Sequence, residues 1–252
     1  MRNRLALRPM TIALPAPPPL ASIASPSLFL DFDGTLVELA PTPDAIAVPS
    51  DLARRLEALA NRHDQRIAVV SGRFLADIDR HLGNAELVMI GSHGAEIRER
   101  NQMDGQNRNL SLPPSAHQAA DDFAARTEGI LIERKPLGIG IHYRARPDLA
   151  DVVEDFTARL SKEHGLHRKR GKMVVELTTC PADKGTAVRE LMARTPFRNG
   201  TPVFIGDDVT DEDGFRVVAA LGGFGILVGE KRATAARYRL GDVAEVHAWL
   251  NL

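Results

Sequence analysis

Two aspartates lie two positions apart in the stretch LFLDFDGTLVE, residues 28–38. Asp31 and Asp33 follow a short apolar run and precede Gly34, so the pattern predicts a buried strand that ends in a turn. At the end of such a strand, side chains and backbone amides can converge on a ligand. Two like charges this close repel each other, so folding alone gives no reason to place them there. The alternative is a solvated turn that happens to contain two aspartates.

A second acidic cluster lies in GDDVTDED, where Asp207 and Asp208 end the predicted strand 201–208. Two acidic clusters at two strand ends predict a strong site for a divalent cation, and ligands that offer only oxygen favour magnesium. The alternative for this stretch is a polar loop in which Thr210 caps the following helix.

Two further groups lie at the ends of predicted elements. Ser71 and Arg73 in VVSGR follow an apolar run, and Lys184 in PADKG lies in the first turn of a predicted helix. A cation at that position opposes the helix dipole, which indicates an anionic neighbour. The alternatives are a simple turn at Ser71 and a solvated surface lysine at Lys184.

Alternating strands and helices must position these groups. Buried strands are predicted at residues 28–30, 67–72, 87–94, 201–208 and 224–229. Helices are predicted at residues 51–60, 74–81, 183–192, 211–220 and 243–250. This alternation indicates an α/β fold with a parallel sheet covered by helices on both faces. Ligands of such sheets bind beyond the carboxyl ends of the strands, where all four groups collect.

The alternation stops between residues 96 and 177, where the pattern predicts an inserted α+β unit. Residues 115–128 and 148–164 have the spacing of helices. Strands are predicted at LIERK, IGIHYR and MVVELTT, the first two antiparallel. We therefore predict a core at residues 27–95 and 178–252, an α+β cap at 96–177 and a proline-rich, mobile extension at 1–26.

The composition is that of an ordinary globular protein. The 252 residues are 44% apolar and 26% charged, and the formal net charge of -1 gives no electrostatic reason for binding nucleic acid or an acidic membrane. Nothing approaches the uninterrupted apolar length of a membrane span. The single cysteine, Cys180, cannot form an internal disulfide, which favours a reducing compartment. We expect a cytoplasmic monomer with neither a nucleic-acid nor a membrane partner.

The order of these motifs, DxDGT, then Ser71, then Lys184, then GDDxxD, resembles the haloacid dehalogenase superfamily of phosphotransferases across the whole core. The resemblance implies a Rossmann-like catalytic core and an aspartyl-phosphate mechanism with Mg2+ as cofactor. It implies that Asp31 is the nucleophile and that Asp33 is the general acid and base. Ser71 and Lys184 would hold the phosphoryl oxygens.

The same resemblance implies the metal ligands and their supports. Asp31, Asp207 and the backbone carbonyl of Asp33 would bind Mg2+. Asp208 and Asp211 would form a second shell that positions metal-bound waters and Lys184.

Six stretches narrow the resemblance to the trehalose-6-phosphate phosphatase family, from about residue 27 to the C-terminus. They are FLDFDGTLVELAPTPD, VVSGR, GSHGAE, HYR, GKMVVEL and GDDVTDED. The family implies a sugar phosphate substrate, trehalose 6-phosphate, hydrolysed to trehalose and phosphate. The alternatives are a phosphatase acting on another sugar phosphate, a sugar-phosphate mutase, and a sugar-phosphate sensor without catalysis; the complete set of catalytic residues argues against the sensor.

The family also implies contacts between the cap and the disaccharide. Glu133 and Lys135 in IERK, and Glu176 in KMVVEL, would bind sugar hydroxyls, while Arg73 would reach the phosphate. Charged acceptors and donors suit a ligand with many hydroxyls. The alternatives are an exposed cross-strand ladder for Glu133 and Lys135, and a loop-capping role for Arg73. Glu176 is more telling, because it interrupts an apolar strand.

Overall fold

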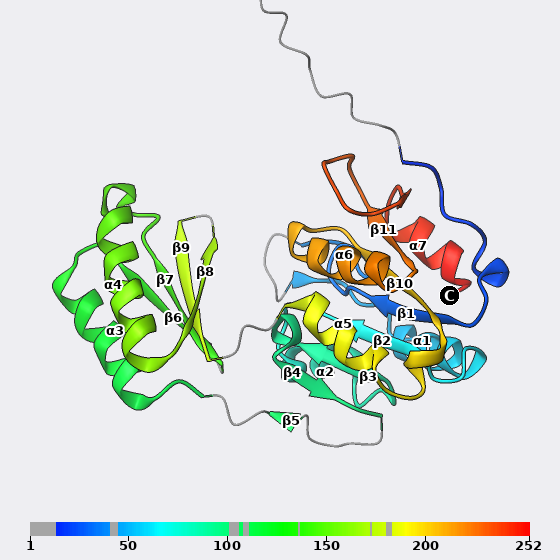
Figure 1. The fold of residues 1–252 in the computed structure, drawn as a ribbon, viewed down its shortest axis with the longest axis horizontal. Coiled ribbons are helices and arrows are strands. Elements are labelled where there is room, and N and C mark those ends of the chain that lie inside the picture. The colour runs from blue at the N-terminus through cyan, green and yellow to red at the C-terminus, as the bar shows by residue number, and fades with distance from the viewer. Residues whose placement is uncertain are drawn as a thin grey trace, which may run out of the picture. The chain divides into compact units, whose positions relative to one another are not determined.

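The structure is a computed structural model that describes residues 14–40, 45–100, 106–107, 111–135, 137–171, 173–179 and 183–252. The chain divides into two compact units, which we call the core unit and the cap unit (Figure 1). The core unit comprises Met1–Gln106 and Asp183–Leu252, and the cap unit comprises Asn107–Ala182. The sequence predicted boundaries after residues 95 and 177, so the cap unit begins and ends later than expected.

The described part of the core unit is built on an eight-stranded sheet with the order β12-β11-β10-β1-β2-β3-β4-β5. Its strands are β1 (Pro26–Leu30), β2 (Ile67–Val70), β3 (Val88–Gly91), β4 (Glu96–Arg98), β5 (Gln106–Asn107), β10 (Thr201–Gly206), β11 (Phe224–Val228) and β12 (Tyr238–Leu240). The six strands from β12 to β3 pair in parallel, and β4 pairs antiparallel with β3. The predicted α/β core with a parallel sheet is confirmed.

Helices cover both faces of this sheet (Figure 1). On one face lie α1 (Leu52–Arg62), α2 (Leu75–Leu82) and α7 (Val243–Leu250), and on the other lie α5 (Lys184–Met192) and α6 (Glu212–Ala220). The sequence dictates this arrangement in β1, where Leu28 and Leu30 pack toward the first face and Phe29 toward the second. Helix α1 presents Leu52, Leu56 and Leu59 at helical spacing, and each buried leucine stabilises the packing by about 1.5–3 kcal/mol.

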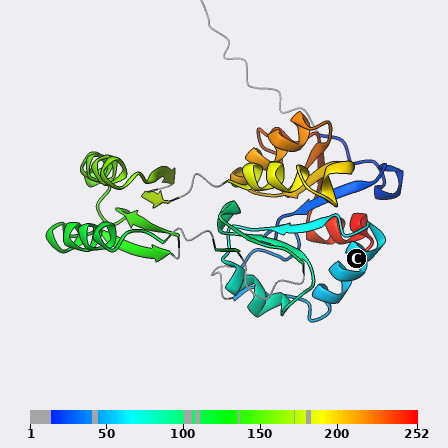
Figure 2. The same ribbon diagram turned by 60° about the horizontal axis from the view of Figure 1, so that its bottom comes forward.

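The cap unit is an α+β layer pair. Its antiparallel sheet has the order β6-β7-β9-β8, with β6 (Leu131–Lys135), β7 (Gly138–His142), β8 (His167–Gly171) and β9 (Val174–Thr178). Helices α3 (Pro114–Arg126) and α4 (Ala150–His164) pack together on one face of this sheet, as Figures 1 and 2 show. Ile139, Ile141, Val175 and Leu177 point toward these helices and form the apolar core of the unit.

Four of the described strands were not predicted, namely β4, β5, β8 and β12. Strand β4 explains why the cap unit begins later than residue 96. It pairs with β3, so residues that were expected in the cap belong to the core sheet. Short 3₁₀ turns complete the described elements, at Leu20–Ser22, Ser92–Gly94, Pro147–Leu149, Phe197–Asn199 and Val209–Asp211. Within the described ranges, no helix is both long enough and apolar enough to cross a membrane.

The prediction of a mobile extension at residues 1–26 fails for residues 14–26, which pack on the core unit. The carbonyl oxygen of Pro18 accepts a hydrogen bond from Trp249 Nε1 at 2.8 Å, and that of Pro15 accepts one from the Arg239 amide at 3.0 Å. Leu20 is buried in the same core. Proline lacks an amide donor but keeps its carbonyl acceptor, so a proline-rich segment can still be anchored in this way. Residues 1–13, like Cys180, lie outside the described ranges.

Candidate active site

The two acidic clusters meet at one edge of the core sheet. Asp31 follows β1 and Asp207 follows β10, and these strands are parallel neighbours with Leu30 paired to Ile205. The Asp31 amide donates to the Ile205 carbonyl at 2.9 Å, which fixes the end of β1 against β10. Both carboxylates therefore lie beyond the carboxyl ends of their strands, as the sequence predicted, and the structure shows in addition that the two strands are adjacent.

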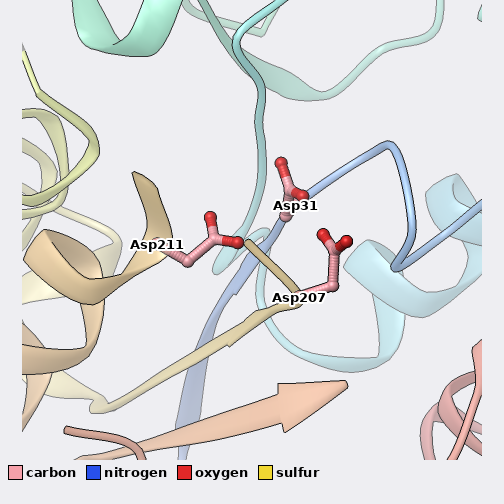
Figure 3. Close-up of side chains that lie close together, drawn as sticks. All are labelled: Asp31, Asp207 and Asp211. Carbon is pink, nitrogen blue, oxygen red and sulfur yellow. The ribbon is translucent and has the colours of Figure 1, made fainter. Parts of the chain in front are cut away.

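A third carboxylate, that of Asp211, joins this pair. Asp31, Asp207 and Asp211 each place an oxygen within 4.8 Å of the others, and Figure 3 shows the three side chains converging. Two glycines make the approach possible. Gly34 has a φ of +72°, and a Cβ there would lie 2.2 Å from Asp207 Oδ2. A Cβ on Gly206 would lie 2.3 Å from the carboxyl carbon of Asp211.

Lys184 supplies a cation to this cluster. Its Nζ donates to Asp31 Oδ1 and to Asp211 Oδ1, both at 2.6 Å, and its side chain is only 3% exposed. The lysine is the first residue of α5, whose N-terminus is capped by the Asp183 side chain accepting from the Thr186 amide at 2.6 Å. The anionic neighbours expected for a cation at this position are Asp31 and Asp211.

Burial and mutual repulsion govern the charges of the cluster. Burial raises the pKa of Asp31 well above its usual range; Lys184 lowers that pKa, and Asp211 raises it further. Burial and the charge of Asp211 likewise raise the pKa of Asp207 to about 6. Burial lowers the pKa of Lys184, but the two carboxylates outweigh this and raise it above its ordinary value. The site thus holds one ammonium group among carboxylates that have a reduced tendency to ionise without a further cation.

The donor set fits a magnesium ion. Its side-chain ligands are oxygens, they are partly or fully buried, and they lie close enough to surround one ion. Asp211 already accepts hydrogen bonds on both oxygens, from Lys184 Nζ at 2.6 Å and from the Asp208 amide at 2.9 Å. Asp31 and Asp207 are therefore the better candidates for direct ligands, and Asp211 for a residue that positions Lys184.

Asp33 points to a different partner. Its two oxygens accept from Arg73 Nε and Nη2, both at 2.7 Å, in a two-point ion pair. Ser71 is buried at the end of β2, and its Oγ accepts from the Arg73 amide at 3.0 Å. The structure thus brings Ser71, Arg73 and Asp33 together beside the cluster, although no motif indicated the Arg73–Asp33 pair.

Asp208 caps the short turn that follows β10. Its side chain accepts from the backbone amide of Asp211, and the Asp211 side chain accepts from the Asp208 amide, which makes a capping box. Burial raises the pKa of Asp208, but hydrogen bonds from the Val209 amide and from Thr210 lower it more, so the net shift is downward. The suggestion that Thr210 caps the following helix is wrong, because Asp211 is the N-cap residue of α6 and Thr210 Oγ1 instead donates to Asp208 Oδ2 at 3.2 Å.

The residues predicted to bind sugar share one face of the cap sheet. Glu133, Gly140, Glu176 and Lys169 are successive register partners across β6, β7, β9 and β8. They belong to the face opposite the isoleucines of β7, which pack on the helices. Glu133 Oε2 lies 2.9 Å from His142 Nε2 on the next strand. Lys135 ends β6 in register with Gly138, and its side chain is outside the described part of the chain.

Comparisons with known proteins agree with this geometry. The trehalose-phosphatase family model matches residues 29–244. A trehalose-6-phosphate phosphatase of Escherichia coli (strain K12) is 34% identical over 229 residues, covering 89% of this chain and 85% of that protein. The structure of an Aspergillus fumigatus trehalose-6-phosphate phosphatase has a TM-score of 0.75 at 28% identity and covers 95% of this chain and 98% of its own.

The fold extends to a wider group of phosphatases. A phosphatase of the haloalkanoate (HAD) enzyme superfamily from Bacteroides thetaiotaomicron has a TM-score of 0.62 at 14% identity, covering 100% of this chain and 98% of its own, a likeness of fold alone. The core is thus the haloacid dehalogenase fold that the sequence predicted. The family match covers most of the chain and includes both acidic clusters and Lys184. The chain belongs to the trehalose-phosphatase family.

Proposed function

We propose that this chain is a magnesium-dependent phosphatase that hydrolyses trehalose 6-phosphate to trehalose and phosphate through an aspartyl-phosphate on Asp31. The observation that carries the proposal is the contact of Asp31 with Lys184 at 2.6 Å, beside the carboxylate of Asp207. Its family membership and the names of its relatives support the substrate.

Charge is the first obstacle to the reaction, because a carboxylate and a phosphate monoester are both negative. Lys184 contacts the nucleophile and offers a fixed charge to the phosphoryl oxygens. Mg2+ held by Asp31, Asp207 and the Asp33 backbone carbonyl would screen the remaining repulsion and orient the phosphate. The buried position of Asp31 also limits competing contact with water.

The covalent step then follows from the position of Asp31. Its carboxylate oxygen attacks phosphorus, the bond between phosphorus and the sugar oxygen breaks, and the electron pair leaves with that oxygen. Asp33 donates a proton to the leaving oxygen. In the second step Asp33 accepts a proton from water, the water oxygen attacks phosphorus, and the bond to Asp31 breaks to release phosphate.

Arg73 links phosphate binding to the contacts that the Asp33 carboxyl group makes. In the structure its guanidinium holds the Asp33 carboxylate by two hydrogen bonds. We expect the dianionic phosphate to draw Arg73 away, so that the Asp33 carboxyl group can turn toward the leaving oxygen. The same arginine would return to Asp33 when phosphate leaves.

We assign sugar recognition to the face of the cap sheet that is opposite its helices. Glu133 and Glu176 flank Gly140 on that face, and a Cβ on Gly140 would come within 3.1 Å of Glu133 Oε2, so the glycine leaves room for this carboxylate. Carboxylates bind sugar hydroxyls by charge-assisted hydrogen bonds, and a site built for such bonds discriminates against ligands that lack them. This supports a sugar phosphate as the substrate.

Phosphate release from a panel of substrates tests the proposal. The panel contains trehalose 6-phosphate, sucrose 6-phosphate, glucose 6-phosphate and p-nitrophenyl phosphate, each assayed with Mg2+ and with chelator. We expect trehalose 6-phosphate to be hydrolysed with the highest kcat/KM, and chelator to abolish turnover. Preference for another sugar phosphate would contradict the substrate, isomerised product without free phosphate would indicate a mutase, and full activity in chelator would contradict the metal.

A further inference from the structure

An arginine outside every motif binds backbone carbonyls of the loop that contains Asp207 and Asp208, which we call the acidic loop. Arg232 lies in the loop between β11 and β12. Its Nη2 donates to the backbone carbonyl of Asp208 at 2.6 Å and, in a longer contact, to that of Asp207 at 3.3 Å. Its Nε makes a second long contact to the Asp207 carbonyl at 3.4 Å.

The same guanidinium is anchored on its other side. Arg232 Nη1 forms an ion pair with Glu212, which lies in the first turn of α6, and donates to the Ala233 carbonyl at 3.2 Å. The second oxygen of Glu212 accepts from the Ala235 amide at 2.7 Å, so one buried carboxylate holds both the arginine and the returning loop. Arg232 therefore connects the β11–β12 loop, the start of α6 and the carbonyls after β10.

The acidic loop needs such support because its carboxylates repel each other. Asp207 lies close to Asp31 and Asp211, and it passes Gly34 so closely that a single Cβ would clash with it. Like charges in a partly buried site favour any movement that separates them. A guanidinium bound to the carbonyls of Asp207 and Asp208 opposes this movement by holding the backbone of both residues.

Arginine suits this position better than lysine would. Its planar fork carries several donors in fixed directions, so one side chain can bind two carbonyls and a carboxylate at once. The ammonium group of a lysine has the same charge but lacks this rigid geometry. The four partners seen here are the carbonyls of Asp207, Asp208 and Ala233 and the Glu212 carboxylate, and they use Nε, Nη1 and Nη2 of one group.

We propose that Arg232 is a positioning residue that holds Asp207 in place to bind the divalent cation. The inference rests on the magnesium dependence proposed above. Residues that orient metal ligands through a second contact commonly alter metal affinity by about 10- to 100-fold. Arg232 acts through the backbone of the loop and has no assigned contact with substrate.

Calorimetric titration of Mg2+ into chelator-treated, desalted protein without substrate tests the proposal directly. Arg232→Ala should raise the Kd for Mg2+ by about 10- to 100-fold. Arg232→Lys should also raise it several-fold, because charge without the fork is insufficient. Lys231→Ala is the matched control, since Lys231 is exposed, adjacent in the chain and equally charged. It should leave the Kd within about 2-fold of the wild-type value.

Two further results distinguish a failure of the proposed magnesium dependence from a failure of the role proposed for Arg232. Asp207→Asn should abolish binding, and if the wild-type chain itself does not bind Mg2+, the proposed function fails rather than the role of Arg232. If wild type binds Mg2+ and Arg232→Ala binds it equally well, the positioning role is refuted. A wild-type Kd for Arg232→Lys would also refute it, because only charge would then matter.

The dependence of turnover on Mg2+ excludes a merely structural role. If Arg232 acts by positioning Asp207, saturating Mg2+ should restore most of the kcat of Arg232→Ala, whereas a damaged fold would not recover. A kcat that stays low at saturating Mg2+ would overturn the proposal. Circular dichroism establishes that each variant is folded, and if Arg232→Ala is not, Arg232→Lys provides the same comparison.

Discussion

Replacing Lys184 by methionine should destabilise the core unit strongly at neutral pH. The lysine side chain is 3% exposed, and its two partners, Asp31 and Asp211, are 5% and 0% exposed. Methionine keeps the length and apolar character of the stem but removes the charge. Breaking a buried ion pair by removing one partner costs about 3–5 kcal/mol, because the other charge stays buried without compensation.

The assay is thermal unfolding at pH 7.5 in chelator. At about 2–4 °C per kcal/mol for a domain of this size, the loss corresponds to a Tm lower by roughly 6–20 °C. Lys231→Met is the control, since this exposed lysine in the same unit should change stability by no more than about 0.5 kcal/mol. A Tm for Lys184→Met equal to that of the control would show that Lys184 does not compensate the buried charges of Asp31 and Asp211.

The difference in Tm between wild type and Lys184→Met should shrink as the pH is lowered toward 5. Burial raises the pKa of Asp31 and Asp211, so the folded variant binds protons that the unfolded chain has already lost. A carboxyl group whose pKa is raised by folding contributes more stability at low pH and loses it as the pH rises through the folded pKa. A difference in Tm that grows on acidification would show that the buried carboxylates are not the cause.

Three other predictions concern the chemistry. Asp31→Asn should abolish phosphate release while its circular dichroism stays that of wild type, because an amide of the same shape cannot attack phosphorus; substantial remaining turnover would contradict this. Mg2+ affinity measured by calorimetry should increase as the pH rises from 5 to 7, because the pKa of Asp207 is about 6 and its proton competes with the metal; a constant Kd would contradict it. Glu176→Ala should lower kcat/KM for trehalose 6-phosphate by about 10- to 1000-fold, or roughly 1.4–4 kcal/mol, and leave p-nitrophenyl phosphate hydrolysis nearly unchanged. An equal loss on both substrates would assign Glu176 to the fold.

The buried parallel strands could be predicted because each is a continuous apolar run. Strand β1 is buried on both faces and carries no polar alternation, so its pattern is unambiguous. Strand β8 was missed for the opposite reason, since HRKRG is mostly exposed at the edge of the cap sheet and resembles a loop. Edge strands are often charged in this way, which hides them from hydrophobic patterns.

Strand β4 was missed because it buries charges. Glu96 accepts from the Leu75 amide at 3.2 Å and from Ser92 Oγ at 2.5 Å, and Arg98 donates to Asp79 at 2.6 Å. Leu75 and Asp79, which are distant in the chain, help to compensate for these buried charges, and no local pattern reveals those two contacts.

In the candidate site, too, positions at strand ends could be predicted from the sequence, whereas side-chain contacts could not. The sequence placed Asp31 and Asp207 at strand ends on one edge of the sheet, because the carboxyl ends of parallel strands meet there. It did not reveal that Arg73 holds Asp33, nor that Arg232 reaches the loop after β10. Those contacts depend on side-chain directions and on loops without motifs, so only the folded chain shows them.

In the proposed mechanism, Asp31 becomes phosphorylated during turnover. The most direct test mixes excess enzyme with Mg2+ and trehalose 6-phosphate labelled with ³²P, stops the reaction in acid within one turnover, and measures the label on the protein. We expect transient labelling that hydroxylamine removes and that maps to Asp31. Asp31→Asn should carry no label. Phosphate released on this timescale without any label on the wild-type protein, or labelling of Asp31→Asn equal to that of wild type, would exclude a covalent intermediate on Asp31.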